Sequence, residues 1–349
     1  MLRLKKRALI MLCIVFSTVM GGCGGTELEN KNFPLAVLVE AQDHQYRICY
    51  LAQNLSQVSN ERSDGDNMTA ASATGSTYYE TQKAFEKNNR CQLDMSHTKV
   101  VVFHKNFIKN GELDLFLDTV RSENTFARNT LVYFMDSSME KMAELNSGLE
   151  IPFGSYLEQM TENEQDIHEK AVVTLGSLLN EQANAGRILL IPVLKAENGM
   201  PAVYEYEVLC NFREAGRIDT KAAQVYYLLA NQLQQMDLHL KADEQVHLNN
   251  ISCSRDFILT GKKVTQQLTL KAEARRITGS AGQKEIEQML QATVDEVCRT
   301  GMEDLQIDIS DSYQYLPMYA PEIYRIYQNR PEEYLYNLDY QIQVQIRIV

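Results

Sequence analysis

The 349-residue sequence lacks most of the short motifs that mark catalytic, metal-binding and nucleotide-binding sites. Its six histidines form neither HxH nor HExxH, and no two cysteines have the CxxC spacing, so the sequence predicts no metal site. It contains no GxSxG, GxGxxG or P-loop, which removes the main signals for a serine hydrolase, a dinucleotide or a nucleoside triphosphate. We therefore expect a protein that is not an enzyme and that holds no cofactor.

Positive charge is also scarce, and long apolar runs are missing from most of the chain. The sequence has 34 Lys and Arg residues and 46 Asp and Glu residues, which gives a formal net charge of −12. Such acidity argues against nucleic acid as a partner and against a basic patch for anionic lipid headgroups. After residue 20 the longest apolar stretch is ILLIPVL (188–194), which is too short to cross a bilayer and reads as a buried strand. Membrane attachment must therefore come from the N-terminus.

The first residues have the organisation of a bacterial lipoprotein signal peptide. MLRLKKR carries four positive charges, ALIMLCIVFSTVM (8–20) is apolar, and Gly21 and Gly22 directly precede Cys23. This pattern is similar to the lipobox, in which an aliphatic residue and two small residues precede the lipidated cysteine. We expect residues 1–22 to be a cleaved signal peptide and Cys23 to carry acyl chains such as palmitate, which anchor the protein in a membrane. The alternative is an uncleaved anchor over residues 8–20.

The rest of the chain is long enough for more than one domain. We expect residues 23–32 to be the lipidated N-terminus and a polar tether, 33–196 an N-terminal α/β region of up to two subdomains, and 197–349 a C-terminal α+β domain. Five further cysteines are scattered beside apolar residues and read as buried thiols.

The pattern of apolar residues predicts an α+β fold with several domains, in which helices cover mixed or antiparallel sheets. Apolar and polar residues alternate in EQVHLNNISC, in TQQLTLKAEARRI and in the final YQIQVQIRIV, as in strands with one buried face. Residues 281–305 follow a helical period. Residues 54–76 are rich in Ser, Asn, Asp, Thr and Gly and are expected to form a mobile loop. No regular βαβ alternation is visible.

Two clusters of residues deserve a functional interpretation. Asp94, Ser96 and His97 have the residue types of a catalytic triad, but triads are assembled from distant segments, so this cluster is more simply structural. Tyrosines are dense between residues 313 and 340. Because aromatic side chains favour protein interfaces, we expect a partner surface there, with Tyr324, Tyr327 and Tyr334 as anchors. The alternative is that these rings pack inside their own domain.

Several stretches, in order, resemble the Ger(x)C family of spore germination lipoproteins. They are Cys23, Glu27–Leu28 with PLAVLVEAQD, LDMSHTKVVVF (93–103), RNTLVY (128–133), VLCNFREAGRIDTKAAQVYYLL, and the helix, Tyr- and Pro-containing segment and alternating strand of residues 281–349. The likeness covers nearly all of the chain after Cys23. It departs from the family pattern where Gly24-Gly25 replaces a Trp-Asp pair, where Ser96 replaces a glycine, and in the absence of tryptophan. These departures indicate a divergent branch.

The resemblance implies a lipoprotein subunit of a nutrient germinant receptor without catalytic activity. In that family the subunit acts in spore germination with two integral membrane subunits, of the A and B types, at the extracytoplasmic face of the inner spore membrane. Two other functions are the alternatives. A solute-binding lipoprotein of a transporter would show a two-lobed parallel α/β pattern, and a cell-surface hydrolase would show a nucleophile or metal motif.

Overall fold

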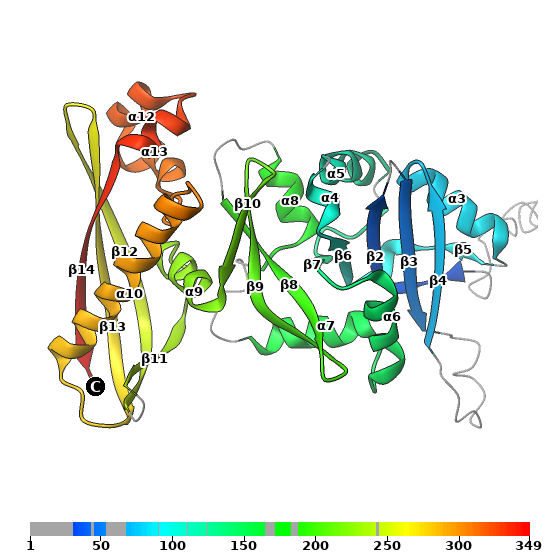
Figure 1. Cartoon of the computed structure of the whole chain (residues 1–349), viewed down its shortest axis with the longest axis horizontal. Helices are drawn as coiled ribbons and strands as arrows, with labels where there is room; N and C mark the ends of the chain where they lie inside the picture. The colour runs from blue at the N-terminus through cyan, green and yellow to red at the C-terminus, as the bar shows by residue number, and fades with distance from the viewer. Residues whose placement is uncertain are drawn as a thin grey trace, which may run out of the picture.

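The computed structural model describes residues 31–42, 45–53, 68–89, 91–109, 111–123, 125–164, 172–182, 188–241 and 244–349. Within these residues the chain forms an N-terminal domain on an eight-stranded sheet and a C-terminal domain on a four-stranded sheet. The two domains lie end to end, which makes the molecule elongated (Figure 1).

Eight strands form the N-terminal sheet: β2 (Pro34–Gln42), β3 (Gln45–Gln53), β4 (Met68–Gly75), β6 (Val100–His104), β7 (Leu131–Met135), β8 (Ile188–Glu197), β9 (Met200–Cys210) and β10 (Arg213–Asp219). Their order is β10-β9-β8-β7-β6-β2-β3-β4. The central strands β2, β6, β7 and β8 pair in parallel. Antiparallel hairpins add β3 and β4 at one edge and β9 and β10 at the other. The sheet is therefore mixed.

Helices cover both faces of this sheet: α3 (Tyr78–Asn88), α4 (Asn106–Lys109), α5 (Glu112–Glu123) and α8 (Leu175–Glu181) on one face, and α6 (Met139–Gly148) and α7 (Phe153–Asn163) on the other. Strand β6 shows why both faces are dry, because all five of its residues, VVVFH, are buried. Val101 and Phe103 join the core under α5, whereas Val100 and Val102 join the core under α6 and α7. A strand buried on both faces has a continuous apolar run rather than an alternating one.

The structure differs from the sequence expectations at two places in this sheet. Residues 68–75, expected within a mobile loop, form β4 along all eight positions of its pairing with β3. Their small Thr, Ala and Ser side chains lie on an edge strand, so they carry no strong apolar signal. The sheet also crosses the boundary predicted between residues 196 and 197, because β8 and β9 form a hairpin.

The C-terminal sheet contains β11 (Gln235–Lys241), β12 (Glu244–Thr260), β13 (Lys263–Thr278) and β14 (Leu338–Ile348), in that order. The first three strands are antiparallel, and β14 returns parallel to β13. The helical elements are α9 (Thr220–Leu229), α10 (Gln283–Asp304), η4 (Ser312–Tyr315), α11 (Leu316–Tyr319), α12 (Pro321–Tyr327) and α13 (Pro331–Asn337). Buried Ile and Val alternate with exposed Gln along β14, so one face of the sheet packs under α10 and the other is polar and open. The alternating strand and the long helix predicted for this region are confirmed.

A shared apolar core joins the two domains. Ile188 and Val208 of the N-terminal sheet pack in one cluster with α9 and with Leu268 of the C-terminal sheet. The Tyr226 hydroxyl of α9 also donates a hydrogen bond to the Ile188 carbonyl at 3.1 Å. Helix α9 therefore links the two sheets, as its place between the domains suggests (Figure 1). Across the described ranges, every helix is too short or too polar to serve as a transmembrane span.

Candidate functional site

The predicted lipid attachment site, Cys23, lies outside the described residues, as does the signal peptide of residues 1–22. The described chain begins with β1 (Lys31–Asn32), which pairs in parallel with β5 (Gln92–Leu93). Lys31 Nζ lies 2.7 Å from Asp94 Oδ2. In Figure 1, β5 lies at the end of the N-terminal domain remote from the C-terminal domain. The first described residues, Lys31 and Asn32, are thus held at that end of the molecule.

Asp94, Ser96 and His97 build a capped turn before β6. The Asp94 carboxylate accepts hydrogen bonds from the Ser96 N–H at 3.1 Å and from the Ser96 hydroxyl at 2.6 Å. The hydrogen bonds from Lys31 and Ser96 lower the pKa of Asp94 to about 2. The His97 ring packs edge-on against Phe33, with ring centroids 5.4 Å apart. The carboxylate therefore caps a turn and anchors Lys31, which gives these residues a structural role.

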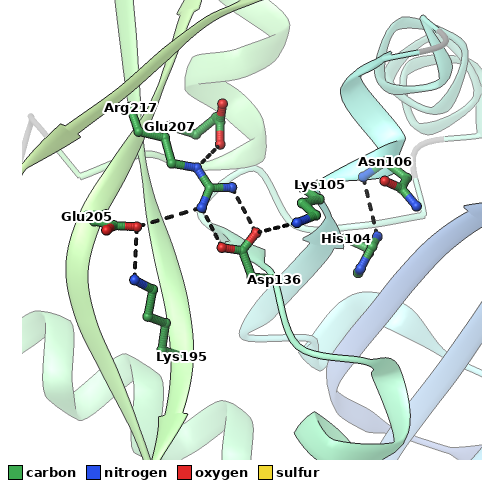
Figure 2. A network of polar contacts seen from close by, with 8 residues as sticks. All are labelled: His104, Lys105, Asn106, Asp136, Lys195, Glu205, Glu207 and Arg217. Carbon is green, nitrogen blue, oxygen red and sulfur yellow. Dashed lines mark hydrogen bonds and ion pairs between the residues drawn. The ribbon is translucent and has the colours of Figure 1, made fainter.

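A network of charged side chains joins the carboxyl ends of the central strands to the β9–β10 hairpin (Figure 2). Asp136 directly follows β7, and Arg217 lies on β10. Arg217 binds Asp136 through both terminal nitrogens, with Nη2 donating to Oδ1 at 2.8 Å. Lys105, which directly follows β6, places Nζ 3.7 Å from Asp136 Oδ1. A bidentate pair of this kind is geometrically specific, so it fixes the hairpin against β7.

The same arginine compensates a buried carboxylate. The Glu207 side chain is 1% exposed, and Arg217 Nε donates to its Oε2 at 2.8 Å. Burial raises the pKa of Glu207, while Arg217 opposes that shift. Hydrogen bonding to Arg217 lowers the pKa of Asp136. The opposite charges neutralise one another, so the network has a structural role: it holds the β9–β10 hairpin against β7 within the domain. Sequence reasoning missed it because Asp136 and Arg217 are 81 positions apart and no motif joins them.

His104 and three of the cysteines are buried in the described part of the chain. His104 is 8% exposed, burial lowers its pKa, and its Nδ1 accepts the Asn106 N–H at 3.3 Å. No group of three His, Cys, Asp or Glu side chains in the described part of the chain could hold a metal ion. Burial raises the pKa of Cys49 and of Cys253 to about 11, so both thiols stay protonated. Cys298 is likewise buried.

Two of the three predicted anchor tyrosines lie inside the C-terminal domain. Tyr327 and Tyr334 are each 1% exposed, and their ring centroids are 5.6 Å apart. Tyr324 is partly buried and packs near Tyr313, with ring centroids 6.1 Å apart. Tyr327 and Tyr334 are therefore core residues, which corrects their assignment as exposed anchors. The physical reason is that α12 and α13 turn these rings toward the start of β13 and β14.

A buried carboxylate organises the polar groups around these rings. Asp308 is 8% exposed, and its Oδ1 accepts hydrogen bonds from the Ser310 hydroxyl and the Tyr340 hydroxyl, both at 2.6 Å. Its Oδ2 accepts the Ser312 N–H at 2.7 Å. The Ser312 hydroxyl lies 2.6 Å from the Tyr334 hydroxyl. The tyrosine-rich segment is thus tied into the domain by hydrogen bonds as well as by apolar packing.

Other apolar side chains of the same segment are exposed. Met318 and Tyr319 of α11 are 77% and 52% exposed, Ile326 of α12 is 43% exposed, and Tyr336 of α13 is 89% exposed. Exposed apolar groups that gather in one region mark interaction sites more often than single ones do. These four side chains, rather than Tyr327 and Tyr334, are the large apolar groups that α11–α13 expose to solvent.

Comparisons with known proteins agree along most of the chain. The family model of the spore germination protein N-terminal domain matches residues 24–196. The structure is similar to the crystal structure of the GerBC protein, with a TM-score of 0.58 and 13% sequence identity over 90% of this chain and 96% of that chain. At this identity the second likeness shows a shared fold. No curated protein matches the sequence significantly. The family match assigns the chain, through its N-terminal domain, to the Ger(x)C family of spore germination proteins, and the shared fold extends over the C-terminal domain.

Proposed function

We propose that this chain is a lipid-anchored C subunit of a nutrient germinant receptor. It would lie at the extracytoplasmic face of the inner spore membrane and bind the membrane-embedded A- and B-type subunits. The observation that carries this proposal is the family match over residues 24–196, which begins directly after Cys23. The match therefore starts at the second residue of the predicted mature chain. In this role the protein binds other receptor subunits rather than catalysing a reaction, as the absence of catalytic motifs predicts.

The distance from Cys23 to the folded body supports a short tether. Lys31 lies eight positions after Cys23, and an extended chain spans at most about 3.5 Å per residue, which gives roughly 28 Å. The N-terminal domain would therefore stay close to the bilayer. Confinement to the membrane raises the effective concentration of any membrane partner, so a docking surface of modest affinity suffices.

The exposed side chains of α11–α13 are the docking surface that we propose for a membrane subunit. The chain is acidic, with a net charge of −12, so it has no excess of positive charge to steer it toward a partner. Binding would instead rest on apolar and aromatic contacts, as expected from the tyrosine-rich segment. Met318 and Tyr336 are the most exposed of these side chains and can be changed without loss of core packing.

Changing the cysteine tests the anchor. Cys23→Ser should move the protein from the membrane fraction to soluble or secreted material, and spores that carry this variant should germinate poorly in response to the nutrient. The matched control, Cys210→Ser, changes a thiol in the folded domain and should leave both unchanged. A Cys23→Ser protein that remains in the membrane with the mass of the uncleaved chain would show that residues 8–20 act as an anchor.

A further inference from the structure

Strand β14 has a long free edge. It is the last strand in the order β11-β12-β13-β14, so only one of its sides pairs with a strand among the described residues. The pairing with β13 runs without a register shift from Leu338 to Ile348. Natural proteins usually blunt such edges with Lys, Pro or a bulge. The sequence LDYQIQVQIRI has none of these, and its two charged residues, Asp339 and Arg347, lie near its ends, so the middle of the edge is free to pair.

The backbone groups that face this edge can be identified from two contacts. The Ile346 N–H donates to Glu287 Oε1 of α10 at 2.9 Å, so it points away from β13. The Tyr340 N–H donates to Asp339 Oδ1 at 3.0 Å. Because alternate residues of a strand direct their backbone groups to the same side, the N–H and C=O groups of Ile342 and Val344 also face the edge. The edge is thus capped by side chains near its ends and open in its middle.

We propose that β14 pairs antiparallel with β14 of a second copy of this chain, about a twofold axis at Gln343. In this register, edge-facing residues oppose edge-facing residues, as the hydrogen-bonded pairs of an antiparallel ladder require. The facing residues are Ile342 with Val344, Tyr340 with Ile346, Leu338 with Ile348, Gln341 with Gln345, and Asp339 with Arg347. The sequence of β14 is therefore complementary to itself on both faces.

The charged residues of β14 favour one register of this pairing and a second copy of the chain as the partner. Asp339 and Arg347 are the only charged residues of β14, both are exposed, and they are equally distant from Gln343. Pairing about Gln343 places a carboxylate opposite a guanidinium at each end of the seam. Moving the axis to Ile342 or Val344 places Asp339 and Arg347 opposite uncharged residues instead. Opposite charges across a strand pair are favourable, and like charges are unfavourable, so a second copy in this register fits the edge.

Pairing would exchange the caps for a continuous ladder. The Ile346 N–H would leave Glu287 for the Tyr340 carbonyl of the second copy, and the Tyr340 N–H would leave Asp339 for the Ile346 carbonyl of that copy. Asp339 pairs with Lys263 at 2.8 Å and Arg347 pairs with Glu273 at 3.4 Å within one copy, so the contact between Asp339 and Arg347 of that copy would add to these exposed ion pairs or replace them. The two four-stranded sheets would become one eight-stranded sheet that has no β14 edge. This inference rests on the C-terminal domain and stands apart from the proposed receptor function.

Single cysteines on the open face test the register directly. At Gln343 the two copies face each other as a non-hydrogen-bonded pair, with Cα atoms about 4.5 Å apart, which suits a disulfide. At Gln341 the two copies are offset by four residues, or about 13 Å, which no disulfide spans. Under mild oxidation the full chain with Gln343→Cys should run as a covalent dimer on a non-reducing gel. On the same gel the chain with Gln341→Cys and the unsubstituted chain should run as monomers, because neither can form the disulfide across the seam.

Two outcomes would overturn the proposal: equal crosslinking at both positions, or crosslinking of Gln343→Cys to a different protein. Charge reversal supplies a second measurement. Asp339→Arg or Arg347→Asp alone should weaken the dimer about tenfold, because each places like charges at both ends of the seam. The double variant should restore the dimer in sedimentation equilibrium. If the double variant dimerises no better than either single variant, the antiparallel register is wrong.

Discussion

The buried carboxylate of Asp308 should contribute strongly to the stability of the C-terminal domain. Asp308→Asn tests this with almost no change in side-chain volume. The carboxylate accepts the Ser310 hydroxyl, the Tyr340 hydroxyl and the Ser312 N–H. An asparagine keeps one oxygen, which can still serve Ser310 and Tyr340. Its NH₂ group would then face the Ser312 N–H, so two donors would meet where the wild type has a donor and an acceptor.

The magnitude follows from the burial of Ser312, which is 0% exposed, so that water cannot replace the lost acceptor. An unsatisfied buried donor costs about 1–3 kcal/mol, and hydrogen bonds to a charged group are each stronger than neutral ones. We expect Asp308→Asn to lower the free energy of unfolding by about 2–4 kcal/mol. The control is Asp339→Asn, because Asp339 is exposed and pairs with Lys263 at 2.8 Å. An exposed ion pair contributes about 0–1 kcal/mol.

Urea unfolding followed by circular dichroism or tyrosine fluorescence measures both variants, since the chain contains no tryptophan. The wild type and the two variants should have similar m-values, so the comparison rests on the midpoints. If Asp308→Asn is no less stable than Asp339→Asn, the hydrogen-bond network around Asp308 does not hold the tyrosine-rich segment in place, and the reasoning fails.

Three further predictions concern stability and composition. Tyr334→Ala should lower the free energy of unfolding by about 3–5 kcal/mol because its ring is fully packed, whereas Tyr336→Ala should change it by less than about 0.5 kcal/mol; equal effects would contradict the assigned burial. The Asp94 carboxyl has a folded pKa of about 2, below the unfolded value of about 3.9, so the stability that it contributes is present above pH about 4 and is lost as the pH falls toward 2. Asp94→Asn should therefore make the melting temperature depend less on pH over this range. If the melting temperature of the variant falls with pH as steeply as that of the wild type, the Lys31 pair does not stabilise the fold. Metal analysis of the purified chain after dialysis against a chelator should find less than about one equivalent of zinc, because a structural site would retain it.

The elements with strong periodicity could be predicted from the sequence. Ile342, Val344 and Ile346 alternate with exposed glutamines in β14, and that pattern alone indicates a strand with one dry face. Ser137 and Ser138 precede a helical pattern and are typical N-cap residues, and Ser138 caps α6 by accepting the Lys141 N–H. Local patterns of this kind depend on neighbours within a few residues, which the sequence displays directly.

Two features could not be predicted in this way: which side of a short helix is buried, and which distant segments of the chain are in contact. Tyr334 and Tyr336 both lie in the seven-residue α13, yet they are 1% and 89% exposed. Helices this short show too few residues to define an apolar face, and the outcome depends on where β13 and β14 lie. The Asp136–Arg217 pair depends in the same way on the pairing of β7, β8, β9 and β10.

Affinity isolation from spore membranes tests the central claim most directly. The tagged chain is solubilised in mild detergent from the inner spore membrane, and the proteins that accompany it are identified by mass spectrometry. The account predicts that A- and B-type receptor subunits accompany the wild type, and that they are lost with a Met318→Asp, Tyr336→Ala double variant that folds normally. Recovery of the wild type without any membrane-embedded receptor subunit would contradict the proposed function.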